Sequence, residues 1–149
     1  GRGSYPIEVG FIEAQGQCFC SLIHPLPDWQ HWDDTAEALH GISRAALLAH
    51  GKPPVWVAAE MNARLRGQTV YCDGWGHDYA WLARLFDSAD MQPSFHLEDL
   101  RMLLNEEEAA RWHSITALVR SELNISRHRA SSDAKVLQLA LQKLRQPNL

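Results

Sequence analysis

Two short apolar runs near the start of the chain predict an antiparallel hairpin. Residues 6–14 are mostly apolar and β-branched, and residues 17–23 form a second run of similar character. A short turn that contains Gly16 separates them, and strand-like runs joined in this way usually pair as antiparallel neighbours. Cys18 and Cys20 would point to the same face of the second strand, and we expect both to be small core residues.

Beyond the hairpin, the spacing of apolar positions becomes mainly helical. Two short helical stretches are predicted within residues 34–50. Pro54 and Gly67 are suitable start and stop signals for a helix over residues 55–66. The remaining predicted elements are short strands at residues 68–72 and 93–97, and helices at residues 77–87, 100–124 and about 131–146.

The order of these elements is typical of an α/β fold. A hairpin, helices, a strand, a helix, a second strand and terminal helices combine antiparallel pairing with a βαβ-like crossover. We therefore expect a mixed sheet flanked by helices. At 149 residues, the chain is long enough to form one domain with a single sizeable core.

Composition and charge place the chain among ordinary globular proteins. It is 46% apolar and 21% charged, and its apolar runs are far shorter than a membrane span. An odd number of cysteines without framework spacing, and a start without a signal-peptide pattern, favour a cytoplasmic protein with reduced thiols. The net charge of −4 argues against a general nucleic-acid coat protein, but is compatible with a nuclease whose basic groups line one groove.

The first candidate for chemistry is Asp78, which follows the strand at residues 68–72 and a glycine-rich turn. A carboxylate there would reach the end of the sheet at which open α/β folds bind ligands. The alternative is an aspartate that only caps its own helix. Trp75 lies close by and would stack on a terminal base, unless it packs as an ordinary aromatic residue under the loop.

The second candidate is the pair His128 and Asp133. The histidine lies just ahead of a predicted helix, and the aspartate lies in the first turn of that helix. Taken singly, Asp133 would be a capping residue and His128 a solvated loop residue. Their joint spacing is more specific than either residue alone.

The segment around this pair resembles the third motif of the DEDDh group of 3′–5′ exonucleases, His-x-Ala-x-x-Asp-Ala. The matching residues are His128, Ala130, Asp133 and Ala134. Asp78 fits the aspartate of the second motif, which lies in the helix after the fourth strand of that family. Residues 5–10 resemble the second strand, and residues 39–43 resemble the short His-Gly-Ile segment after the third strand. The resemblance covers nearly the whole chain, with four features in the family order.

The family's first motif, Asp-x-Glu on the first strand, has no counterpart in residues 1–149. Glu8 is no replacement, because it matches a glutamate of the second strand. We expect the missing strand to precede residue 1, so that residues 1–149 are a single, N-terminally incomplete exonuclease-like domain. The alternatives are truncation and a degenerate relative. In the family fold the first strand is central, so a chain without it would leave two sheet edges unpaired.

The resemblance implies a ribonuclease H-like fold and a metal-dependent reaction at the 3′ end of DNA or RNA. Asp78 and Asp133 would supply ligands to two Mg²⁺ or Mn²⁺ ions, and two carboxylates alone would bind them weakly. His128 would take a proton from the attacking water. The products would be nucleoside 5′-monophosphates, and many relatives are dimers, so a homodimer is possible here too.

Two other interpretations stay open at this point. In the first, the chain is a non-catalytic nucleic-acid-binding or interaction module that kept the fold and lost the first motif. In the second, it is an unrelated α/β protein in which Asp78, His128 and Asp133 lie far apart.

Overall fold

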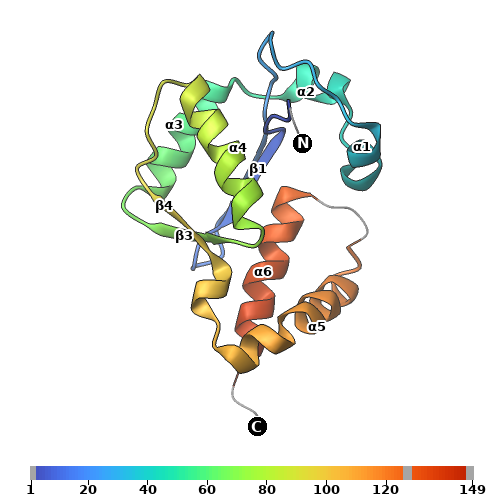
Figure 1. The fold of residues 1–149 in the computed structure, drawn as a ribbon, viewed down its shortest axis with the longest axis vertical. Coiled ribbons are helices and arrows are strands. Elements are labelled where there is room, and N and C mark those ends of the chain that lie inside the picture. The colour runs from blue at the N-terminus through green and yellow to red at the C-terminus, as the bar shows by residue number, and fades with distance from the viewer. Residues whose placement is uncertain (1–2, 126–128, 147–149) are drawn as a thin grey trace.

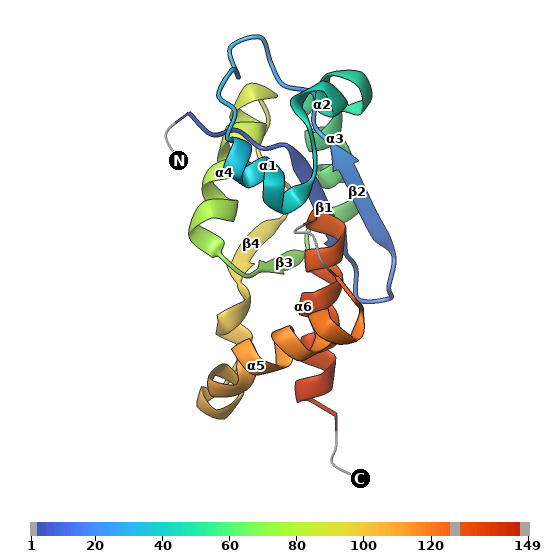
Figure 2. The ribbon, with the colours of Figure 1, turned by 90° about the vertical axis from the view of Figure 1, so that its right-hand side faces the viewer.

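The computed structural model describes residues 3–125 and 129–146, and their arrangement is shown in Figures 1 and 2. The strands are β1 (Glu8–Ile12), β2 (Cys18–Leu22), β3 (Thr69–Cys72) and β4 (His96–Asp99). The helices are α1 (Asp34–His40), α2 (Arg44–His50), α3 (Pro54–Leu65), α4 (Trp75–Ser88), α5 (Glu106–Glu122) and α6 (Ala130–Leu144), with the short 3₁₀ helix η1 (Leu100–Leu103) before α5. The fold is therefore mixed α/β, as predicted, with helix as the larger part.

The N-terminal hairpin forms as predicted. β1 and β2 pair in an antiparallel register that places Phe11 opposite Phe19, and the two rings stack with their centroids 5.1 Å apart. Gly16 takes the left-handed φ of 91° that the turn requires and that a glycine adopts without strain. The expectation for Cys18 and Cys20 was wrong, because Phe19 occupies the buried face of β2 and both thiols lie on the exposed face.

The predicted sheet is present as two separate pairs of strands. Among the described residues β1 pairs with β2 alone, and β3 pairs with β4 in a parallel register that places Val70 opposite Leu97. The helix α4 provides the crossover between the two parallel strands. Figure 2 shows the two pairs at different places in the molecule. The described residues therefore form two two-stranded sheets, one antiparallel and one parallel, in place of the one mixed sheet that was expected.

The long helix predicted over residues 100–124 is divided into η1 and α5. The division occurs at Asn105, whose Oδ1 accepts a hydrogen bond from the Glu108 N–H at 2.8 Å. The Glu108 carboxylate accepts in return from the Asn105 N–H at 3.0 Å. This capping box starts a new helix, and for that reason the helical pattern could not continue through it.

Two clusters of buried side chains take the place of the single core that was expected. The first lies between the hairpin, α3 and α4, and includes Ile23, Val57 and Phe86. The second lies between α5 and α6, and is made of Leu100, Trp112, Val119, Val136 and Ala140. α6 packs against both β1 and α5, so it joins the two parts of the molecule.

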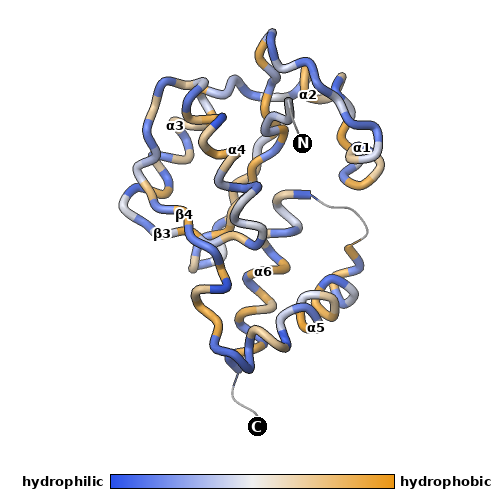
Figure 3. The backbone as a smooth tube through the Cα atoms, viewed as in Figure 1, coloured by the Kyte–Doolittle hydropathy of each residue, from blue (hydrophilic) through white to orange (hydrophobic). Residues whose placement is uncertain are grey.

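Apolar and polar residues alternate along the helices, as Figure 3 shows for α3, α4 and α6. Each of these helices therefore has a face to bury and a face for solvent. Over residues 3–125 and 129–146, none of the helices combines the length and the apolar character that crossing a membrane would need.

Candidate metal site

Asp78 lies in the first turn of α4, immediately beyond the end of β3. The capping position of this helix is Gly74, which has a left-handed φ of 89°, so Asp78 does not serve as the cap. Burial raises the pKa of the Asp78 carboxyl. A hydrogen bond from Cys72 and the charge of His77 act in the opposite direction, while Asp73 and Asp133 add to the increase. Asp78 is therefore a carboxylate with unfavourable surroundings for its charge.

Cys72 is the last residue of β3 and the neighbour of that carboxylate. Burial raises the pKa of its thiol to about 12, and the nearby charges of Asp78, Asp99 and Asp73 contribute further. The thiol therefore keeps its proton at neutral pH, and its Sγ donates a hydrogen bond to the Glu98 carbonyl oxygen at 3.7 Å. A half-buried thiol that keeps its proton is a weak nucleophile.

Asp133 lies in the first turn of α6 and forms an ion pair with α5. Its Oδ1 accepts a hydrogen bond from Nη2 of Arg120 at 2.8 Å. The side chains of Arg120 and Asp133 are 31% and 41% exposed. The charge of Asp133 makes the smallest of the contributions that change the pKa of Asp78. His128 lies outside the described residues.

The donor chemistry of Asp78 and Asp133 suits a hard divalent cation. Carboxylate oxygens are the ligands that Mg²⁺ prefers, and this ion usually keeps several waters beside one or two carboxylates. Within residues 3–125 and 129–146, no group of three or more His, Cys, Asp or Glu side chains is arranged to hold a metal ion. The two aspartates have the ligand chemistry of the expected magnesium site, and that site stays a prediction.

Glu8 fixes the start of α6, a role that sequence reasoning missed. Its side chain is only 7% exposed, although it lies on β1 among partly buried neighbours. The carboxylate accepts from Nη2 of Arg129 and from the Ala130 N–H, each at 2.7 Å. It thereby caps α6 from another element, and its hydrogen bond raises the pKa of Arg129. The only signal in the sequence was a charged residue inside an apolar strand.

Gly10 brings β1 close to the same turn of α6. A Cβ added to this glycine would lie 2.7 Å from the Ala130 carbonyl carbon and 2.7 Å from the Ser131 nitrogen. Such distances are shorter than any normal contact, so only a glycine allows this approach of strand and helix. Glu8 and Gly10 together determine where the first turn of α6, and with it Asp133, lies relative to β1.

Trp75 is the first residue of α4 and is partly exposed. Its Nε1 donates to the Leu97 carbonyl oxygen at 3.3 Å, which ties the ring to β4. The ring stacks on Tyr79, with 5.0 Å between the centroids and 28° between the planes. Trp75 is 39% exposed and Tyr79 is 54% exposed, so this pair forms an aromatic surface beside Asp78.

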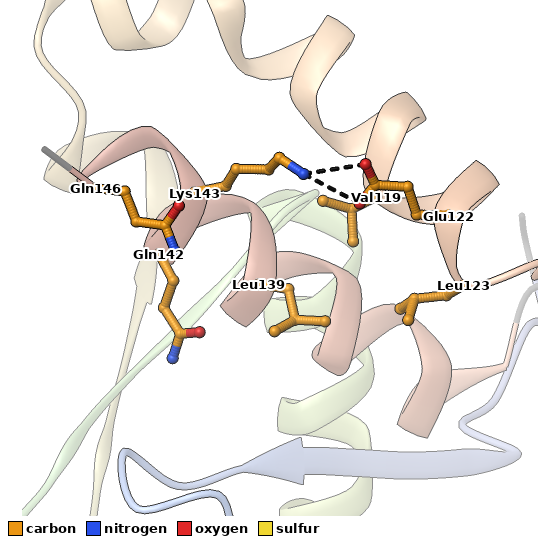
Figure 4. Close-up of a pocket in the computed structure, with 7 residues that line it drawn as sticks. All are labelled: Val119, Glu122, Leu123, Leu139, Gln142, Lys143 and Gln146. Carbon is orange, nitrogen blue, oxygen red and sulfur yellow. Dashed lines mark hydrogen bonds and ion pairs between the residues drawn. The ribbon is translucent and has the colours of Figure 1, made fainter. Parts of the chain in front are cut away.

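A shallow cavity of about 180 Å³ lies between α5 and α6, but Asp78 and Asp133 do not line it. Figure 4 shows Lys143 of α6 extending toward the Glu122 carboxylate of α5 within this cavity. The Lys143 Nζ lies 3.0 Å from both carboxylate oxygens. The cavity therefore contains a second ion pair between the two helices and no carboxylate pair of its own.

Neither the known protein families nor the curated proteins include one that matches this chain. Its function is therefore inferred from its own residues and their geometry.

Proposed function

We propose that residues 1–149 form the part of a metal-dependent 3′–5′ exonuclease that carries the second and third acidic motifs on a ribonuclease H-like fold. The substrate is the 3′ end of DNA or RNA, and the products are nucleoside 5′-monophosphates. The division of the sheet into an antiparallel pair and a parallel pair is the observation that supports this proposal most strongly.

The antiparallel pair has an open edge on β1. The Ile23 N–H donates to the Ile7 carbonyl at 2.9 Å, so Ile7 and every second residue after it direct their backbone groups toward β2. The backbone groups of Glu8, Gly10 and Ile12 consequently point to the opposite edge. An additional strand has a row of donors and acceptors to pair with on this side.

The parallel pair has a corresponding open edge on β3. The His96 N–H donates to the Gln68 carbonyl at 2.9 Å, so the alternate residues Val70 and Cys72 direct their backbone groups toward β4. Thr69 and Tyr71 then present their backbone groups on the other side. β1 and β3 are the two strands that the central first strand of a ribonuclease H-like sheet would join. A strand between β1 and β3 would account for both unpaired edges at once.

The second support is the placement of Asp78 and Asp133, each in the first turn of its own helix. Asp78 begins its helix directly after a strand end, and Asp133 is held in position by the contacts of Glu8 and Gly10 with α6. Both carboxylates would bind the divalent cations. Such cations, when bound, orient the attacking water and offset the charge of the leaving 3′ oxygen.

His128 is the proposed general base. An imidazole is suited to take a proton from the attacking water at neutral pH. In the sequence it comes directly before Arg129, the residue that Glu8 binds. Trp75, held by Leu97 and Tyr79, would stack on the terminal base of the substrate.

Replacing His128 with alanine tests this assignment. The protein for the assay is the longest natural polypeptide that contains residues 1–149, incubated with Mg²⁺ or Mn²⁺ and a 5′-labelled oligonucleotide. We expect His128→Ala to lower kcat by about 10² to 10⁴-fold, because a positioned general base contributes that much. The control is His113→Ala, at an exposed position on α5, which should leave kcat unchanged. Unchanged shortening by the His128→Ala variant would contradict the proposal.

A non-catalytic nucleic-acid-binding module is the second candidate, and the ion pair between Arg120 and Asp133 favours it. That pair already neutralises Asp133 without a cation. Such a module would bind the labelled oligonucleotide without shortening it. Its affinity would also be the same with EDTA as with Mg²⁺, whereas the exonuclease requires the cation.

A further inference from the structure

Arg120 joins α5 to α6 at the proposed metal ligand Asp133. It lies in the last turn of α5, and Asp133 lies in the first turn of α6. The hydrogen bond between Nη2 and Oδ1 is 2.8 Å long, which is typical of a charge-assisted bond. One oxygen of a proposed ligand is thus already occupied by a positive group.

We infer that Arg120 competes with the divalent cation for Asp133, so that loading of the site requires Arg120 to leave. This inference concerns regulation of the proposed exonuclease site, and it depends on Asp133 being a ligand there. A guanidinium stays charged at every pH at which the protein is folded. Two cations on the same carboxylate oxygen repel each other, so each one lowers the occupancy of the other.

The ion pair is weak enough for a divalent cation to displace Arg120. Both side chains are about one-third exposed or more, and ion pairs with such exposure are screened by water and contribute little to stability. A divalent cation also carries twice the charge of the guanidinium, which strengthens its attraction to the carboxylate. Among the described residues, the Arg120 side chain forms no hydrogen bond other than the one to Asp133.

Release of Arg120 need not separate the two helices. Trp112 and Val119 of α5 pack against Val136 and Ala140 of α6 in the second buried cluster. The ion pair between Lys143 and Glu122, at 3.0 Å, also joins the same helices without involving Asp133 (Figure 4). The competition therefore affects the cation rather than the fold.

These two ion pairs allow a matched experiment. The variants are Arg120→Gln, Arg120→Lys and the control Lys143→Gln, whose pair has similar exposure, 37% and 52%. Mn²⁺ binding to the same natural polypeptide is measured from the electron paramagnetic resonance signal of the free ion. We expect Arg120→Gln to bind Mn²⁺ about fivefold more tightly, the upper range for removal of an exposed ion pair. Arg120→Lys should fall between it and the wild type, and Lys143→Gln should match the wild type.

A urea titration without metal completes the comparison. Arg120→Gln and Lys143→Gln should unfold at similar urea concentrations, so that a difference in Mn²⁺ affinity reflects competition rather than a loosened helix pair. Equal or weaker Mn²⁺ binding by Arg120→Gln overturns the inference. If Asp133→Asn abolishes Mn²⁺ binding while Arg120→Gln has no effect, the competition is wrong and the proposed function stands. If Asp133→Asn leaves Mn²⁺ binding unchanged, Asp133 is no ligand, and both proposals fail.

Discussion

At the scale of the residue, the candidate site consists of polar groups whose charge is disfavoured by burial or whose position is fixed by hydrogen bonds. Asp78 carries a charge that burial disfavours, and Cys72 keeps its proton because of burial and the nearby acidic charges. Glu8 is nearly buried, yet it is satisfied by Arg129 and Ala130. A half-buried carboxylate that makes the folded state less stable is typical of a functional rather than a structural residue.

The effect of Asp78 on stability has a definite sign. Burial raises its pKa in the folded protein, so folding favours the protonated form. The stability gained this way is complete below the ordinary pKa of 3.8 and is lost as the pH rises through the higher folded value. Asp78→Asn should therefore unfold at a higher urea concentration than the wild type at pH 7, by no more than about 1 kcal/mol because solvent screens this half-exposed group.

This difference should disappear near pH 3, where the wild-type carboxyl is protonated in both states. Urea titrations of the two proteins at the two pH values measure it. A variant that is less stable than the wild type at pH 7 would show that the Asp78 charge supports the fold.

The charge of Glu8, unlike that of Asp78, should stabilise the folded protein. Glu8→Gln weakens the charge-assisted bonds to Arg129 and leaves a nearly buried group poorly paired, which should lower the free energy of unfolding by about 1–3 kcal/mol. The matched control is Glu122→Gln, which removes the exposed ion pair with Lys143 and should cost less than about 1 kcal/mol. Equal losses in the two variants, measured by urea unfolding at pH 7, would contradict a special role for Glu8.

At the scale of the element, the contact of β1 with α6 determines the position of the helix turn that carries Asp133. The strand approaches the helix at Gly10, and the added Cβ would meet backbone atoms of Ala130 and Ser131 that cannot rotate away. The first turn of α6 carries Asp133, so a displacement of this turn also moves the proposed ligand. Packing and site geometry are therefore coupled at this contact.

Gly10→Ala should reveal that coupling. We expect it to lower the free energy of unfolding by about 1–3 kcal/mol, the usual cost of overpacking, and to weaken Mn²⁺ binding. Gly76→Ala on α4 is the control, since a Cβ there meets nothing within 4 Å, and it should be neutral or stabilising by up to about 1 kcal/mol because alanine favours the helix. If Gly10→Ala has the same free energy of unfolding and the same Mn²⁺ affinity as the wild type, β1 and α6 are not tightly packed.

The sequence predicted the helices and strands better than it predicted which of them pack or pair with each other. The hairpin, the strand before Asp78 and the last helix follow from local periodicity and turn residues, and all three are present. Two errors were also local in origin: strand alternation places Cys18 and Cys20 on one face but does not say which face is buried, and the capping box at Asn105 went unrecognised.

The contacts around the site could not be predicted in the same way. Arg120 and Asp133 are joined by the crossing of two helices, and Glu8 reaches Arg129 across most of the chain. No spacing rule connects residues at such separations. The acidic positions Asp78 and Asp133 could be singled out because each follows a recognisable local signal, whereas the groups that bind or hold them depend on the tertiary fold.

At the scale of the whole molecule, the two open strand edges are the main feature to explain. The described residues form an antiparallel pair, a parallel pair and two buried clusters, and α6 packs against the antiparallel pair and against α5. In a ribonuclease H-like fold one central strand would pair with both β1 and β3. That strand would also bring the first acidic motif to Asp78 and Asp133, so completion of the sheet and completion of the metal site would be a single event.

The proposed function is tested most directly by measuring whether the protein shortens a 5′-labelled oligonucleotide from its 3′ end. With Mg²⁺, the natural polypeptide that contains residues 1–149 should produce a ladder of shortened products and release nucleoside 5′-monophosphates. EDTA should abolish the ladder, and Asp78→Asn or Asp133→Asn should reduce it by at least about 100-fold, as expected on loss of a metal ligand. A wild-type protein that binds the oligonucleotide without shortening it, or an Asp133→Asn variant that shortens it at the wild-type rate, would contradict the proposed function.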